Sequence, residues 1–151
     1  MLDQRILNEI EHGRKIVGQA GEIWGWETPA GKVRWMRRVK LLTSHITPYS
    51  KVLEIGCGTG YFTRELLKTG ADILAIDISP DLLSKARNNI NTSNVEFRQE
   101  NAYELSSIPD DSFDAVMGSS VLHHLEVDRV LAQFHRVLKT KGTLTSPSPI
   151  C

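Results

Sequence analysis

The sequence predicts an α/β fold in which helices cover a doubly wound parallel sheet of about five strands. Three observations support this fold class. Short apolar runs alternate with helical patterns from about residue 48 onward, an acidic residue ends the second run, and glycines follow the first run at every second position. Alternating strands and helices need crossover connections, which make neighbouring strands parallel. We therefore expect a sheet domain over residues 48–151, preceded by an N-terminal helical cap or lid segment over residues 1–47.

The composition is that of an ordinary globular domain. A length of 151 residues suits one domain with one core. Eighteen basic and eighteen acidic side chains cancel, so the net charge gives no reason to expect nucleic acid or a membrane as a partner. No apolar run approaches the roughly 18 residues that span a bilayer. Cys57 and Cys151 make no disulfide framework, and the charged N-terminus is unlike a secretory signal, so we expect a cytoplasmic location.

The first 47 residues predict two helices. A short helix is expected within residues 1–12, and a second begins at Thr28-Pro29 and runs to about His45. The apolar positions of the second helix, which we expect to be buried, are Val33, Met36, Val39, Leu42 and Ile46.

Tryptophans and basic residues in this segment have two interpretations each. Trp24, Trp26 and Trp35 either form a lid over a ligand or anchor the helices to the sheet. Arg34, Arg37, Arg38 and Lys40 form a basic stripe, which is most often a solvated helix face. The alternative for the stripe is a phosphorylated or nucleic-acid substrate.

A strand and a glycine turn follow. Lys51–Ile55 predicts a buried strand and Tyr61–Thr69 a helix, with Gly56, Gly58 and Gly60 between them. Glycines at such a turn let the backbone bend tightly and come close to a ligand. The dinucleotide fingerprint is G-x-G-x-x-G, whereas here Tyr61 stands where its third glycine should fall. This spacing disfavours an NAD-dependent oxidoreductase.

The second strand is predicted over Ala71–Ile78, with Asp77 near its end. A carboxylate only accepts hydrogen bonds, so Asp77 can accept both from a ribose diol. The alternative is that Asp77 caps the next helix. Ser79-Pro80-Asp81 predicts that helix start, with a capping hydroxyl, a proline at the first position and an acid in the first turn.

Three further segments complete the pattern. A third strand is predicted over Val95–Gln99, and a fourth ends at Met117. Glu126–Thr140 predicts a helix with one apolar face. That face consists of Val127, Val130, Leu131, Phe134, Val137 and Leu138. Residues 138–144 then predict a turn into a fifth strand.

Five motifs in order resemble the class I S-adenosylmethionine (SAM)-dependent methyltransferases, in particular their type 11 group. They are E-x-G-x-G-x-G at residues 54–60, Asp77, Glu100-Asn101-Ala102, the segment from Ser112 through His123-His124, and Leu138-Lys139-Thr140-Lys141-Gly142-Thr143-Leu144. The resemblance covers roughly residues 48–146 and implies a Rossmann-like fold. That family's sheet normally has seven strands, so we expect this chain to be truncated before strands six and seven.

The resemblance also implies a cofactor site for SAM, whose product is S-adenosylhomocysteine (SAH). Glu54 and the loop residues Gly56, Cys57, Gly58 and Gly60 are expected to hold the methionine part. Asp77 is expected to hold the ribose, Ile78 to pack on the adenine, Asn101 and Ala102 to bind the adenine edge, and Ser119 to lie near the reacting methyl group.

His123 is the candidate catalytic base, since a neutral imidazole can take a proton from an acceptor hydroxyl or amine. A structural, loop-ordering role for the histidine pair is the favoured alternative. No metal site is expected, because two adjacent histidines point apart and no acidic or Cys ligands lie at useful spacing.

The expected function is methyl transfer from SAM to an unidentified, small-molecule acceptor. The alternative is a non-catalytic SAM- or SAH-binding module, or an inactive fragment of a methyltransferase. A sheet that stops after its fifth strand leaves an uncovered edge, which favours association. We therefore expect self-association, for example as a homodimer.

Overall fold

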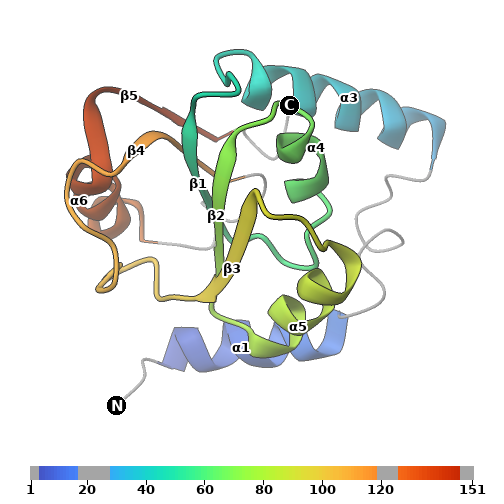
Figure 1. The fold of residues 1–151 in the computed structure, drawn as a ribbon. Coiled ribbons are helices and arrows are strands. Elements are labelled where there is room, and N and C mark those ends of the chain that lie inside the picture. Colours follow the sequence, from blue (N-terminus) through green and yellow to red (C-terminus); the bar gives the residue numbers. More distant parts are fainter. Residues whose placement is uncertain (1–3, 17–27, 119–125, 147–151) are drawn as a thin grey trace.

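The computed structural model describes residues 4–16, 28–118 and 126–146. Its centre is a five-stranded, all-parallel sheet in the order β3-β2-β1-β4-β5 (Figure 1). The strands are β1 (Lys51–Ile55), β2 (Asp72–Asp77), β3 (Val95–Gln99), β4 (Phe113–Met117) and β5 (Leu138–Thr145). The described helices are α1 (Gln4–Ile16), α3 (Pro29–Thr43), α4 (Thr63–Leu67), α5 (Pro80–Asn89) and α6 (Val127–Val137). The predicted fold class is confirmed.

The two faces of the sheet carry separate cores. On one face, α3, α4 and α5 pack on the strands through Leu42, Phe62, Leu66, Leu83 and Ile90, among others. On the other face lie α6 and the segment after β3, and their buried side chains are Leu105, Ile108, Val130, Phe134 and Val137. Because β1 and β2 are buried on both faces, they read in sequence as continuous apolar runs.

Side-chain caps fix two of the helix starts. The Thr28 hydroxyl accepts the N–H of Gly31 at 3.0 Å, and the Ser79 hydroxyl accepts the N–H of Leu82 at 3.3 Å. A proline follows each cap at the start of the helix, where its missing N–H costs nothing. Both predicted helix starts are confirmed.

The predicted buried side of α3 is wrong in part. Val33 and Met36 are 50% and 69% exposed, whereas Leu42 is buried. The reason is Trp35, whose ring makes edge-to-face contacts with Tyr61 at 5.0 Å and Phe62 at 5.9 Å between ring centroids. This contact turns the helix so that Trp35 faces the sheet. Trp35 therefore acts as an anchor; Trp24 and Trp26 lie outside the described residues.

Other predicted boundaries also differ. The first helix reaches Ile16 rather than residue 12, and α3 ends at Thr43 rather than about His45. β2 covers Asp72–Asp77 rather than Ala71–Ile78, and α4 covers only Thr63–Leu67, because turns precede and follow it. The helix predicted to reach Thr140 ends at Val137, and β5 begins at the next residue because Leu138 already pairs with Phe113 of β4. The turn expected within residues 138–144 is an irregularity within β5, where the partners of β4 jump from Leu138 to Thr143.

The strand order determines where a ligand is expected. The chain passes from β1 outward to β3 and then returns to place β4 on the other side of β1. Open parallel sheets bind ligands at the carboxyl ends of the strands, beside such a reversal. In Figure 1 the carboxyl ends of the strands point downward, and α1 lies below them, beside α5. Within the described ranges, no helix combines the length and apolar character needed to cross a bilayer.

Candidate functional site

The loop after β1 has a backbone that favours glycine. Gly56, Gly58 and Gly60 have φ values of 69°, 56° and 85°, in the left-handed region. A Cβ on Gly58 would meet no described atom within 4 Å, whereas one on Gly60 would lie 2.7 Å from Ile90 Cδ1 of α5. Gly60 thus allows close packing of the loop on α5, and the backbone at Gly58 is accessible to a ligand.

Asp77 clamps this loop to the end of β2. Its two carboxylate oxygens accept the N–H of Gly58 and the N–H of Ser79, each at 2.9 Å. Burial raises the pKa of Asp77, and the two backbone hydrogen bonds act in the opposite direction. Each oxygen keeps a lone pair, so the clamp leaves Asp77 able to accept further hydrogen bonds.

Glu54 is the buried acid beneath the loop. Its side chain is 1% exposed, and its Oε2 accepts the Thr63 hydroxyl at 2.6 Å. Its Oε1 has no hydrogen-bond partner among the described residues. The pKa of Glu54 is raised to about 7, mainly because the group is buried; the Thr63 hydrogen bond lowers the pKa and the Asp77 carboxylate raises it. A buried polar atom without a partner is rare in folded proteins, so Oε1 is suited to accept a hydrogen bond from a ligand.

Cys57 is close enough to Glu54 and Asp77 for both acids to act on its thiol. Its thiol is buried and free, and burial raises its pKa well above the usual range, with Glu54 and Asp77 adding to the effect. A thiol in this state is a poor nucleophile. Cys57 therefore contributes packing and its backbone N–H, which donates to the Ile76 carbonyl at 3.0 Å.

The residues after β2 and β3 form the next part of the site. The Gln99 amide donates to the Ile78 carbonyl at 3.0 Å and so joins the ends of β3 and β2. The Asn101 side-chain oxygen accepts the Tyr103 N–H at 2.9 Å and closes a turn. This oxygen, expected to accept a hydrogen bond from adenine, already accepts one from the Tyr103 N–H. Ala102 packs against the core on the face of the sheet that α6 covers.

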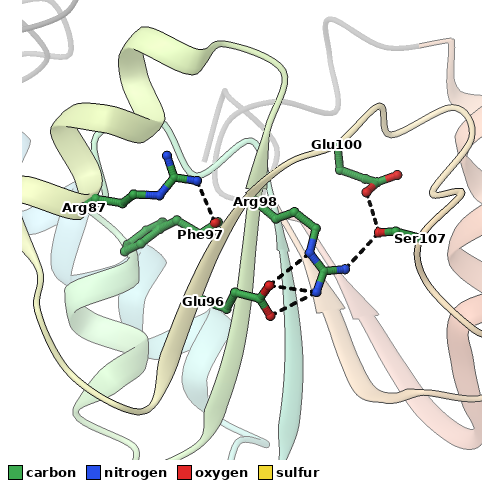
Figure 2. Close-up of polar contacts among 6 residues, drawn as sticks. All are labelled: Arg87, Glu96, Phe97, Arg98, Glu100 and Ser107. Carbon is green, nitrogen blue, oxygen red and sulfur yellow. Dashed lines mark hydrogen bonds and ion pairs between the residues drawn. The ribbon is translucent and has the colours of Figure 1, made fainter.

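A polar network fixes the loop after β3 to the outer strand (Figure 2). Arg98 forms a forked pair with Glu96 at 2.9 and 3.0 Å and donates to the Ser107 hydroxyl at 2.8 Å. Ser107 in turn donates to Glu100 at 2.6 Å. This network was not predicted. The signal was present, because Glu96 and Arg98 alternate along a strand and so share one side of it, and Glu100 follows directly after the strand.

A second contact joins three distant segments. The Tyr103 hydroxyl accepts the N–H of Glu126, and the Arg129 guanidinium lies 4.3 Å from the centre of the Tyr103 ring. Glu126 also pairs with Arg5 of α1 and with Arg129. The hydrogen bond from Arg129 is the largest of the effects that lower the pKa of Glu126. This cluster of Arg5, Tyr103, Glu126 and Arg129 ties α1 and the start of α6 to the loop after β3, and no sequence pattern indicated it.

The helix α1 comes close to the clamp residues. A Cβ on Gly13 would lie 2.5 Å from the Ser79 hydroxyl oxygen and 2.8 Å from the Ser79 Cβ, so the backbone of α1 packs tightly against the Ser79 side chain. Burial is the main cause of the raised pKa of Asp77, and Glu9 of α1 adds to it. The N-terminal helix therefore lies against the edge that carries Asp77.

The structure brings the described site residues together at one edge of the sheet. Those residues are Glu54, Gly56, Cys57, Gly58, Gly60, Asp77, Ile78, Asn101 and Ala102, and they end or follow β1, β2 and β3. Ser119 and His123 lie outside the described residues. Among the residues that are described, no three His, Cys, Asp or Glu side chains are placed to hold a metal ion. A hollow of about 650 Å³ lies elsewhere, at the start of β4 and β5, where His45, Asp114 and Lys139 line it.

The chain is similar in sequence to known methyltransferases. Residues 53–146, more than half of the chain, match a family model described as a methyltransferase domain. A ubiquinone biosynthesis O-methyltransferase from Methylococcus capsulatus is 32% identical over 128 residues, which cover 79% of this chain and 54% of that protein. A demethylmenaquinone methyltransferase from Tropheryma whipplei is 37% identical over 110 residues, covering 72% of this chain and 45% of that protein. The chain thus spans about half the length of these curated relatives.

One solved structure shares the fold over nearly the whole of this chain. The structure described as a complex of DhpI with SAH superposes with a TM-score of 0.75 at 26% identity. The superposition covers 97% of this chain and 70% of that one.

Proposed function

The chain belongs to the class I methyltransferases through its methyltransferase domain at residues 53–146, and from this membership we propose that it transfers a methyl group from SAM to a small-molecule acceptor. When bound, SAM supplies a methyl group that its sulfonium already makes electrophilic. The protein's task is then to hold donor and acceptor in line and to keep water out.

The observation that carries the proposal is the unpartnered Oε1 of the buried Glu54. A carboxyl group in this position, directly before the glycine loop, fits a ligand that brings a cationic N–H donor. The amino group of SAM is such a donor. The accessible backbone at Gly58 fits the close approach of the same part of the ligand.

The remaining described residues fit the nucleoside part. The free lone pairs of Asp77 suit the two ribose hydroxyls, and Ile78 stands next to Asp77 to cover the adenine. Asn101 and Ala102 supply an amide and a backbone N–H for the adenine edge. Ser119 beside the methyl group and His123 as the base stay predictions.

The small-molecule acceptor is supported by relatives. The two curated relatives are named for ubiquinone biosynthesis and for demethylmenaquinone, which favours a small organic acceptor over nucleic acid. The balanced net charge of the chain agrees with this choice.

We also propose that α1, within the predicted segment 1–47, caps the cofactor. Its Gly13 packs on Ser79, and its Arg5 pairs with Glu126. The predicted cytoplasmic location stays a prediction.

Calorimetry and turnover test the proposal separately. We expect the folded protein to bind SAM and SAH, and the absence of both titrations would remove the cofactor site. Release of SAH from SAM with a panel of hydroxyl, amine and carbon acceptors then tests catalysis. Binding without turnover across the panel would favour the alternative of a non-catalytic SAM-binding module.

A further inference from the structure

The hydroxyl of Thr63 is used differently from those of Thr43, at the end of α3, and Thr69, in the turn after α4. Thr43 and Thr69 donate to carbonyls of their own turns, at 2.8 Å to Val39 and 2.5 Å to Leu66. Thr63 donates instead to Glu54, nine residues earlier in the chain and on another element. Thr63 is fully buried, so no water competes for this bond.

The carboxyl of Glu54 has no other described group to hold it. On the sheet, Glu54 lies between Ala75 of β2 and Met117 of β4, and neither side chain can donate a hydrogen bond. The bond to Thr63 occupies Oε2, and Oε1 is left without a partner among the described residues.

We propose that Thr63 is a positioning residue that holds Oε2 of Glu54 and thereby reserves Oε1 for the amino group of the bound cofactor. The inference rests on the proposed function, since it concerns the same site. Thr63 itself touches no ligand in this arrangement, and its effect passes through Glu54.

In this arrangement, binding of the amino group should change the protonation of Glu54. Burial raises the pKa of Glu54 to about 7, so near neutral pH the ligand-free carboxyl carries a proton part of the time. Among the described residues, the titratable groups that act on Glu54 or are acted on by it are Asp77 and Cys57, and Arg87 of α5 acts on Cys57. An ammonium group at Oε1 favours the ionised carboxylate, so binding releases that proton to solvent. At pH 7 we expect about half a proton released per ligand bound.

Two ligands separate Glu54 from Asp77. SAH carries the amino group, whereas 5′-methylthioadenosine has the same ribose and adenine without it. Titrations of each ligand in two buffers of different ionisation enthalpy give the number of protons released. We expect release near pH 7 with SAH in the wild-type protein, and none with SAH in E54Q beyond what methylthioadenosine shows.

The role of Thr63 is tested by the pH profile of SAH affinity between pH 6 and 8.5. T63V removes the hydroxyl that favours the ionised carboxylate, so its profile should move to higher pH by about one unit. At pH 7 the affinity should fall about five- to tenfold and largely recover at pH 8.5. T63S should restore the wild-type profile, and T43V, a matched change at a threonine away from the site, should leave it unchanged.

Each outcome decides a different claim. An unshifted T63V profile, or no proton release by SAH, overturns the role of Thr63 and Glu54 while the nucleoside site stands. Failure of the wild-type protein to bind either ligand overturns the proposed function itself. Should T63V not fold, the proton count of the wild-type protein against E54Q still decides whether Oε1 receives the amino group.

Discussion

Two acids at the site, the buried Glu54 and the partly buried Asp77, have different surroundings. Asp77 accepts two backbone N–H groups and so fixes the shape of the glycine loop. Glu54 accepts a single hydroxyl and keeps one oxygen without a described partner. Asp77 therefore combines a structural and a binding role, while Glu54 is held ready for a cation. Substitutions at the two positions should consequently fail in different ways.

Removal of the Asp77 carboxylate should weaken the cofactor site strongly. D77A loses the clamp on Gly58 and the acceptors for the ribose, so we expect SAH affinity to fall by about one to two orders of magnitude. D77N keeps one side-chain acceptor and should fall between D77A and the wild-type protein. Calorimetric titration measures all three, and an unchanged affinity in D77A would remove this residue from the site.

The pKa of Glu54 predicts how stability depends on pH. Its value rises from 4.5 to about 7 on folding, so between these pH values the folded state binds more protons than the unfolded state. Stability therefore falls as pH rises through this window, by roughly 3 kcal/mol at most from this group. The side chain of E54Q cannot titrate, so the free energy of unfolding of E54Q minus that of the wild-type protein should increase as the pH rises from 5 to 7.5. Urea unfolding at both pH values measures the change, and a constant difference between the proteins would contradict it.

At the scale of elements, local patterns predicted more than contacts between elements. The predictions were correct to the residue for two strands, Lys51–Ile55 and Val95–Gln99, and for both helix starts that contain a proline. The reason is that a buried strand and a helix cap each depend on residues adjacent in the sequence. The glycine loop is equally local. The buried side of α3 was wrong because Trp35 packs on the residues after that loop, which no pattern within the helix reveals.

The same reasoning explains the parts of the site that were missed. The cluster of Arg5, Tyr103, Glu126 and Arg129 joins residues up to 121 positions apart in the chain. Thr63 is close in sequence to Glu54, yet threonine hydroxyls at or near helices also donate to backbone carbonyls, as those of Thr43 and Thr69 do. Only the folded structure decides between the two partners.

The contact between α1 and α5 should be sensitive to one methyl group. In an exposed helix, Gly to Ala usually gains stability, by about 1 kcal/mol. At Gly13 the added Cβ would lie 2.5 Å from the Ser79 hydroxyl, so we expect G13A instead to lose about 1–3 kcal/mol or to release α1. Hydrogen exchange of α1 and thermal unfolding measure this. H12A, at an exposed neighbour, is the control, and a stabilised G13A would show that α1 does not pack there.

At the scale of the whole molecule, β5 is one of the two edge strands of the sheet. It pairs with β4, most of its residues are exposed, and Leu144 is 39% exposed. On α6, Val127 and Leu131 are 51% and 39% exposed. Lys139 and Lys141 on the same strand oppose pairing of two copies by their charge. Association of two copies through β5 therefore depends on the balance between the exposed apolar side chains, which favour it, and the lysines, which oppose it.

We expect this balance to favour a dimer through β5 at micromolar concentration. Because the lysines repel each other, salt should strengthen association by screening them. L144K should shift the protein to monomer, while L7K, at an exposed leucine of α1, should not. Sedimentation at low and high salt measures the mass, and a monomer under both conditions would contradict the expectation.

The labelling rate of the buried Cys57 thiol can report how often the glycine loop opens. The thiol is enclosed and its pKa is raised, so an alkylating reagent modifies it only when the loop opens. In a protein carrying C151S, the labelling rate then counts openings of the loop. A ligand that binds only the closed loop slows labelling in proportion to one plus its concentration divided by its dissociation constant. Any candidate molecule for this edge of the sheet can thus be ranked by mass spectrometry, without a label and before its chemistry is known.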